Sequence, residues 1–167
     1  MIVIIFGVSG AGKTTVGKLL ARKLSWPFIE ADDFHPTANI EKMRGGHPLT
    51  DKDRWPWLER LRQQIERSLA TRENAVLACS ALKRAYRDRL RVSDEVKFVF
   101  LSGDYARIEK QLRSRHGHFM KPDLLQSQFR DLEEPQPDEH VLTIELGGTP
   151  EELVERIKSE TELTNSG

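Results

Sequence analysis

The chain has 167 residues, 38% of them hydrophobic and 31% charged, a balance that favours one globular domain with a charged surface. Its 26 basic and 26 acidic residues give a formal net charge of zero, so no overall positive field attracts nucleic acid or an anionic membrane. Cys79 is the single cysteine, which excludes an intrachain disulfide and a cysteine-rich metal site. The apolar N-terminal run is too short to span a membrane, and we expect a cytoplasmic protein.

The first fifteen residues contain the strongest functional pattern in the chain. A continuous apolar run from Ile2 to Phe6 predicts a strand buried on both faces. The segment from Gly7 to Thr14 then matches the phosphate-loop pattern G-x-x-x-x-G-K-[ST], and helical periodicity follows it at once. In this pattern Lys13 meets the β- and γ-phosphates and Thr14 offers its hydroxyl to Mg²⁺. A chance glycine-rich turn would explain neither the lysine nor the spacing. The residues expected to bind ATP here are Gly7, Val8, Ser9, Gly10, Ala11, Gly12, Lys13, Thr14 and Thr15.

Acidic residues follow the second predicted strand, residues 26–29. Glu30 and Asp32 stand at its carboxyl end, where open α/β sheets bind their ligands. Two positions apart on an extended chain, their side chains would point the same way. A solvated acidic turn that caps the next helix is the alternative, and the neighbouring phosphate loop favours the functional interpretation. We expect Asp32 to orient the attacking hydroxyl and Glu30 to assist Thr14 with the metal.

The segment between the second and third predicted strands is where we expect the acceptor to bind. A short helix comes first, and Thr50 with Asp53 then resembles a capping box that starts a long amphipathic helix. Arg54 stands between acidic and aromatic residues and is the expected ligand of an anionic substrate. Trp55 and Trp57 fit the core better than a ligand-stacking role.

A third apolar strand, residues 75–78, precedes a helix expected over residues 82–91 that carries five basic residues. Lys83 and Arg87 are four apart, so they share one helical face near the ligand edge of the sheet. A solvated basic face is the usual explanation of such a run. Binding of an anionic substrate is the alternative, and the sequence leaves both interpretations open.

Residues 113–122 form a polar segment, marked by glycine and proline, between two predicted helices. Arg113 and Arg115 in a short irregular segment fit a lid that closes over the phosphates of ATP. An ordinary basic surface loop is the alternative.

The remaining segments continue the alternation of strands and helices. Strands are expected at residues 96–101 and 141–145, and a last helix starts with Pro150 at its first position. Such alternation predicts a parallel sheet with helices on both faces. We expect one domain over residues 1–160 and a disordered tail at 161–167.

Several segments together resemble the gluconokinase family, small P-loop kinases of sugar acids related in fold to shikimate and nucleoside monophosphate kinases. The resemblance covers roughly residues 1–135. It rests on GVSGAGKT (7–14), Asp32 with His35-Pro36, NIEKM (39–43), PLTDKDRWPWL (48–58), CSALK (79–83), YRD (86–88) and GHFM (117–120).

The resemblance implies a three-layer α/β/α P-loop kinase with a five-stranded parallel sheet, an acceptor-binding helical insertion at about 35–70 and a lid at about 113–122. The implied reaction is ATP-dependent phosphorylation of D-gluconate to 6-phospho-D-gluconate with Mg²⁺, in a homodimer. The metal ligands expected from the residues themselves are Thr14 and Glu30. The expected catalytic residues are Lys13, Asp32 and Arg115. The residues expected to bind gluconate are Asp32, His35, Arg54, Lys83 and Arg87.

One departure from the family pattern concerns the acidic strand end. Related kinases often carry Asp-x-Asp there, and Glu30 replaces the first aspartate. Asp33 also stands where many relatives have an apolar residue. Whether Glu30 or Asp33 assists the metal therefore stays open.

Two other functions are alternatives to this one. Shikimate kinase is the enzyme alternative, but the glycine-rich turn of that family after the third strand is replaced by Cys79-Ser80-Ala81. A nucleotide-binding switch of the GTPase kind is the non-enzyme alternative, and the sequence contains no Asn-Lys-x-Asp guanine signature.

Overall fold

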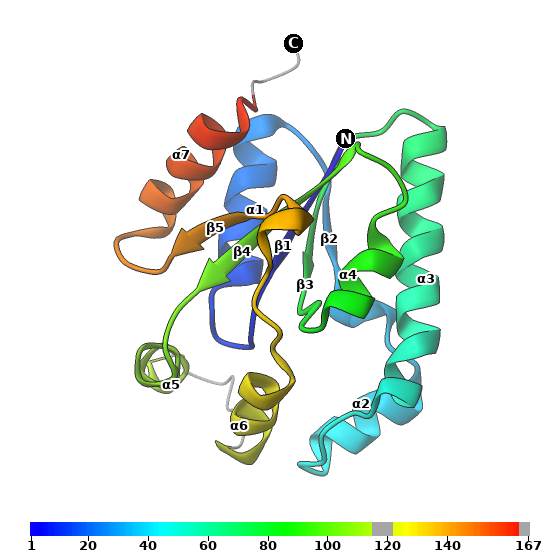
Figure 1. Ribbon diagram of the computed structural model, residues 1–167, viewed down its shortest axis with the longest axis vertical. Coiled ribbons are helices and arrows are strands. Elements are labelled where there is room, and N and C mark those ends of the chain that lie inside the picture. Colours follow the sequence, from blue (N-terminus) through cyan, green and yellow to red (C-terminus); the bar gives the residue numbers. More distant parts are fainter. Residues whose placement is uncertain (115–121, 164–167) are drawn as a thin grey trace.

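The computed structural model describes residues 1–114 and 122–163. Its centre is a sheet of five parallel strands in the order β2-β3-β1-β4-β5 (Figure 1). The strands are β1 (Ile2–Phe6), β2 (Phe28–Glu30), β3 (Ala75–Cys79), β4 (Val96–Ser102) and β5 (Leu142–Glu145). The phosphate-loop strand β1 is therefore central, between β3 and β4. This arrangement confirms the expected five-stranded parallel sheet.

Helices cover both faces of the sheet and give the expected three layers (Figure 1). On one face, Val3 and Ile5 of β1 pack with α1 (Lys13–Leu24) and α7 (Pro150–Thr161). On the other face, alternate β1 residues pack against α3 (Asp51–Ala70) and α4 (Arg84–Leu90). All five residues of β1 are buried, which explains why its sequence is continuously apolar rather than alternating.

Side-chain caps start the helices α3 and α7. Thr50 and Asp53 form the predicted capping box at the start of α3, each side chain accepting from the other residue's backbone N–H. Thr149 is the N-cap of α7, and Pro150 occupies the first turn as expected. The helix α7 extends through Thr161, and Leu163 is buried in the core, so this part of the expected tail packs against the fold. Residues 164–167 lie outside the described residues.

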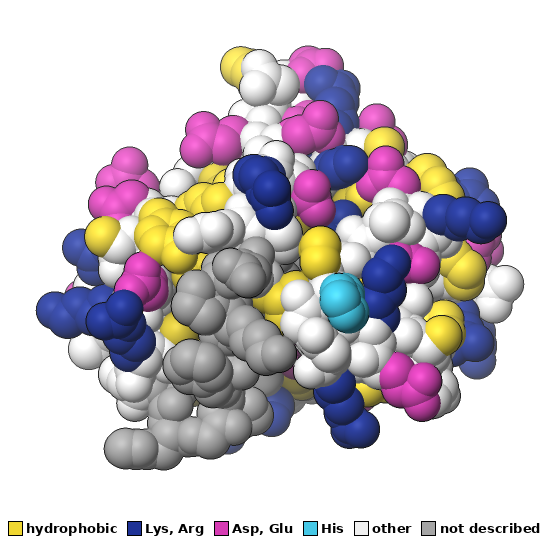
Figure 2. Space-filling view, turned by 90° about the horizontal axis from the view of Figure 1, so that it is seen from below, with side chains coloured by type: hydrophobic (Ala, Val, Ile, Leu, Met, Phe, Trp, Pro, Cys, Tyr) yellow, Lys and Arg dark blue, Asp and Glu magenta, His cyan; other side chains and the backbone are white. Residues whose placement is uncertain are grey.

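The ligand edge of the sheet is formed by the segments that follow the strands. After β2 the chain enters a 3-10 turn, η1 (Ala31–Phe34), and then α2 (Thr37–Arg44). The remaining elements at or near this end are α5 (Tyr105–Arg113) and α6 (Pro122–Asp131), and a second 3-10 turn, η2 (Pro137–Glu139), leads into β5. Viewed onto α5, α6 and α2, basic and acidic side chains are interspersed, and neither sign forms a continuous patch over the described residues (Figure 2). Among the helices of the described chain, none is long and apolar enough to cross a membrane.

Candidate active site

The phosphate loop runs from the end of β1 to the first turn of α1. Gly12 is the N-cap of α1 and has a φ of 92°, a left-handed conformation that favours glycine. Gly10 also has a positive φ, 84°, and a Cβ there would approach the Leu112 side chain to 2.5 Å. The Lys13 ammonium donates to the carbonyls of Gly7 and Val8, both at 2.9 Å. The predicted loop is therefore present, with its lysine arched over the backbone.

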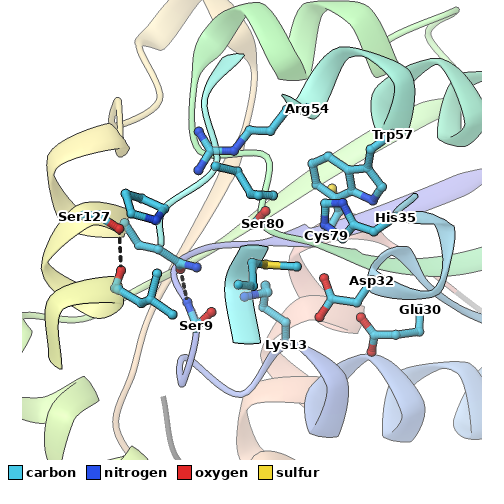
Figure 3. Close-up of a pocket in the computed structure, with 15 residues that line it drawn as sticks. Ser9, Lys13, Glu30, Asp32, His35, Arg54, Trp57, Cys79, Ser80 and Ser127 are labelled. Atoms are coloured by element: carbon cyan, nitrogen blue, oxygen red, sulfur yellow. Dashed lines mark hydrogen bonds between the residues drawn. The ribbon is translucent and has the colours of Figure 1, made fainter. Parts of the chain in front are cut away.

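Glu30 and Thr14 meet beside this loop. The Thr14 hydroxyl donates to Glu30 Oε2 at 2.6 Å. Burial raises the pKa of the half-buried Glu30 carboxyl, and the Thr14 hydrogen bond opposes that shift. Asp32 lies close by and faces the same pocket (Figure 3). Asp32 belongs to the 3-10 turn η1 rather than to an extended strand. Its direction therefore comes from this turn and not from the alternation of side chains along a strand.

These oxygen atoms fit the chemistry of Mg²⁺. A hydroxyl and one or two carboxylates are the ligands that this ion prefers, with water and substrate phosphates completing its shell. Among the described residues, no three His, Cys, Asp or Glu side chains gather into a cluster that could hold a metal alone. The Thr14 hydroxyl and the Glu30 carboxylate therefore suit an ion that arrives with a nucleotide.

One pocket joins the phosphate loop to the predicted acceptor segment (Figure 3). Its walls come from the phosphate loop, β2 with η1, the α2–α3 segment, the end of β3, and α6. The lining residues are Ser9, Lys13, Glu30, Asp32, His35, Met43, Pro48, Leu49, Arg54, Trp57, Cys79, Ser80, Leu124, Ser127 and Gln128. The structure thus brings together Lys13, Asp32, His35 and Arg54.

His35 is fixed in this pocket by aromatic packing. Its ring stacks on the Trp57 indole with 4.4 Å between centroids and 13° between planes. Trp57 is only 1% exposed, and its Nε1 donates to the Ala31 carbonyl at 2.7 Å. Burial lowers the pKa of His35 and favours the neutral imidazole. Trp57 therefore belongs to the core, as predicted, and also supports the turn that carries Asp32. The same prediction was wrong for Trp55, which is 41% exposed.

Arg54 approaches the pocket from α3 and is held by two partners. Its Nη1 donates to the Tyr86 hydroxyl at 2.9 Å and to Asp131 Oδ2 at 3.0 Å. Burial disfavours the charge, but the bonds to Tyr86 and Asp131 raise the pKa of Arg54 above its usual value. A guanidinium oriented in this way, and lining the pocket, is suited to a carboxylate.

Arg87 does not reach the pocket, which corrects its assignment as a substrate ligand. Its side chain is 1% exposed and pairs with Glu139, with Nε at 2.7 Å from Oε1. The remaining guanidinium nitrogens donate to the carbonyls of Ala81, Leu82 and Glu133. Arg87 therefore ties the β3–α4 loop to the segment after α6.

Lys83 is also absent from the pocket lining. The helix α4 begins at Arg84 rather than at residue 82, and Lys83 is its extended N-cap. Lys83 and Arg87 therefore do not share a helical face. The Lys83 ammonium pairs instead with Asp51 at 2.9 Å, beside the Tyr86 ring.

The predicted lid falls largely outside the described residues. Arg113 is the last residue of α5, and its 76% exposed side chain pairs with Glu109 rather than lining the pocket. Arg115 and residues 116–121 lie outside the described residues. The lid therefore stays a prediction.

The helix α6 supplies functional contacts that sequence reasoning missed. Gln128 Oε1 accepts the Ser9 backbone N–H of the phosphate loop at 2.6 Å, and Asp131 holds Arg54. Gln128 and Asp131 are three apart, on neighbouring positions of one helix. The sequence offered only apolar periodicity for this helix, which gives no signal for polar partners.

Comparison with known proteins identifies the family. The sequence model of the family described as shikimate kinase matches residues 9–138. The thermosensitive gluconokinase of Escherichia coli (strain K12) is 50% identical over 137 residues, 81% of this chain and 73% of that protein. A probable gluconokinase of Xenopus tropicalis is 42% identical over 97% of this chain and 94% of its own. The chain belongs to the gluconokinase family.

A solved structure agrees with this membership of the gluconokinase family. The crystal structure of a gluconokinase from Sinorhizobium meliloti 1021 superposes with a TM-score of 0.83 and 40% identity, covering 96% of this chain and 94% of the other. The resemblance found in the sequence is thereby confirmed, and the protein is an ATP-dependent kinase. The match to the shikimate kinase model reflects the fold that the two families share.

Proposed function

We propose that this gluconokinase-family protein transfers the γ-phosphoryl group of ATP to D-gluconate and forms 6-phospho-D-gluconate. One observation carries the proposal: a single pocket contains the phosphate-loop lysine, the Asp32 carboxylate and the buried Arg54 guanidinium. These three groups match the needs of a phosphate donor, a hydroxyl nucleophile and an acid anion. The names of the relatives support the choice of sugar acid.

The reaction follows from the positions of these groups. The 6-hydroxyl of gluconate lies beside Asp32, which accepts its hydrogen bond and takes its proton as the new oxygen–phosphorus bond forms. The bond between the γ-phosphorus and the oxygen bridging to ADP breaks, and the negative charge moves onto ADP. Lys13 and the loop N–H groups stabilise that charge. Arg54 holds the carboxylate of gluconate at the other side of the pocket.

Mg²⁺ is proposed as the metal, held by Thr14 and Glu30. When bound with the nucleotide, it neutralises charge on the phosphates. The oxygen-rich donor set beside the loop supports this choice. Removal of the metal by EDTA should abolish turnover, and added Mg²⁺ should restore it.

The experiment that tests the proposal is a coupled assay of ADP release over a panel of acceptors. Gluconate should give the highest kcat/KM, with shikimate and nucleoside monophosphates near background. Higher activity with shikimate would favour the alternative that the fold allows. ATP hydrolysis that no acceptor stimulates would favour a nucleotide-binding switch.

We also propose a cytoplasmic homodimer, as the family resemblance implies and as the use of ATP suggests for the compartment. Light scattering coupled to size-exclusion chromatography should give twice the mass of one 19.2 kDa chain. A single-chain mass over the working concentration range would contradict the homodimer.

A further inference from the structure

The side-chain amide nitrogen of Asn39 makes two contacts. This buried residue of α2 is 5% exposed. Its Nδ2 donates to the Asp53 backbone carbonyl at 2.8 Å and lies 3.2 Å from His35 Nδ1. The first contact settles the orientation of the amide, because a carbonyl oxygen can only accept a hydrogen bond.

This orientation determines where the proton of His35 resides. The amide nitrogen of Asn39 can only donate, so Nδ1 of His35 must accept and carries no proton. A neutral imidazole has one N–H, which must then be on Nε2. Burial of His35, which is 8% exposed, favours that neutral form.

The protonated nitrogen reaches the proposed acceptor pocket. His35 lines the pocket together with Asp32, and no other described residue contacts its Nε2 by a hydrogen bond. No buried side-chain nitrogen or oxygen of the described residues lacks a partner, so Nε2, which has none, is not fully buried in this pocket-lining residue. The stack on Trp57 fixes the plane of the ring.

We propose that Asn39 is a positioning residue that holds His35 as an Nε2–H donor to a hydroxyl oxygen of the acceptor. The inference rests on the proposed function for the identity of that acceptor, a polyhydroxy acid. An Nε2–H group cannot take a proton, so His35 is not the base of the reaction. The proton of the attacking hydroxyl then goes to a carboxylate of the pocket, which agrees with the role proposed for Asp32.

A purely structural role for Asn39 is the competing explanation. Its bond to Asp53 joins α2 to the start of α3, and that bond alone would also account for its burial. The two explanations differ in what they require of the ring: only the proposal needs the Nε2–H tautomer.

Nitrogen NMR of the protein labelled with ¹⁵N-histidine reads the tautomer directly, without substrate or turnover. The chain has five histidines, and the spectrum of His35→Gln identifies the His35 signals. We expect a protonated Nε2 and an unprotonated Nδ1 at neutral pH. A protonated Nδ1 would overturn the proposal. Because this measurement needs no acceptor, its failure is distinct from failure of the proposed gluconate activity.

A pair of substitutions tests the role of the donor. In His35→Gln the amide nitrogen can take the place of Nε2–H, whereas the shorter Asn in His35→Asn reaches only as far as Nδ1. We expect His35→Asn to raise the KM for gluconate about tenfold, the scale of one lost hydrogen bond, and His35→Gln to raise it less. The KM for ATP should stay unchanged in both. Equal KM values for gluconate in the two variants would overturn the donor role.

Discussion

The two halves of the site are built in different ways. The phosphate-binding half is one continuous segment after β1, and it uses backbone groups, glycine conformations and one lysine. The acceptor half is built from side chains of η1, α3, α6 and the end of β3, which are far apart in sequence. A site made of backbone can be recognised from spacing alone, whereas a site made of side chains depends on how distant elements pack.

The helix α6 connects these two halves. Gln128 binds the phosphate loop at Ser9, and Asp131 holds Arg54, the proposed ligand of the acceptor carboxylate. The same helix thus contacts one residue in the phosphate-binding half and one in the acceptor half. Variants that affect one half selectively test this division.

Asp32 stands where the two halves meet, so its loss should have the largest effect. Asp32→Asn keeps the size of the side chain but cannot take the proton, and we expect kcat to fall by roughly 10²–10⁴. Calorimetry with a non-hydrolysable ATP analogue should show unchanged nucleotide binding. The control is Asp33→Asn, since Asp33 is exposed and absent from the pocket lining; it should stay close to full activity. An active Asp32→Asn with an inactive Asp33→Asn would show that Asp33, not Asp32, is the catalytic carboxylate.

Lys13 belongs to the phosphate half alone. Removing one donor aimed at the transferring phosphoryl group typically costs about 10²–10³ in kcat, and Lys13→Ala should show that loss. Steady-state kinetics with saturating gluconate measures it. Near-normal turnover would show that the loop is not the phosphate cradle.

Arg54 belongs to the acceptor half. A hydrogen bond to a charged group contributes about 1.5–3 kcal/mol, so Arg54→Ala should raise the KM for gluconate about 10- to 100-fold. The KM for ATP should change little. A similar rise in both values would move the carboxylate site elsewhere.

Arg87 lies outside the pocket, so its replacement should affect stability and not acceptor binding. Its loss leaves Glu139 buried without its cation, which should lower the free energy of unfolding by about 3–5 kcal/mol. Urea denaturation of Arg87→Met measures this loss, and the double variant with Glu139→Leu should recover much of it. The KM for gluconate at a temperature where the variant is folded should not change. A selective rise in that KM would return Arg87 to the acceptor site.

The sequence predicted the strands and most helix ends because local signals determine them. Buried parallel strands are continuously apolar, and the Thr50–Asp53 box and Pro150 mark helix starts within four residues of chain. The sequence correctly predicted that Asp32 lies at the ligand edge. The 3-10 turn that carries it was not indicated by any pattern.

The errors came from contacts between distant residues. The expectation that Lys83 and Arg87 share one helical face was wrong because α4 begins two residues later than expected. The partner of Arg87 is Glu139, 52 positions away, and no local pattern marks that acid as buried. The contacts of Asn39 and Gln128 likewise exist only after α2 and α6 have packed.

The orientation of gluconate across the pocket is the central claim, and a crystal structure with gluconate and a non-hydrolysable ATP analogue tests it most directly. We expect the carboxylate within hydrogen-bonding distance of Arg54 and the 6-hydroxyl beside Asp32, facing the γ-phosphate. A gluconate bound in the reverse direction, with its carboxylate at Asp32 and its 6-hydroxyl at Arg54, would contradict the account.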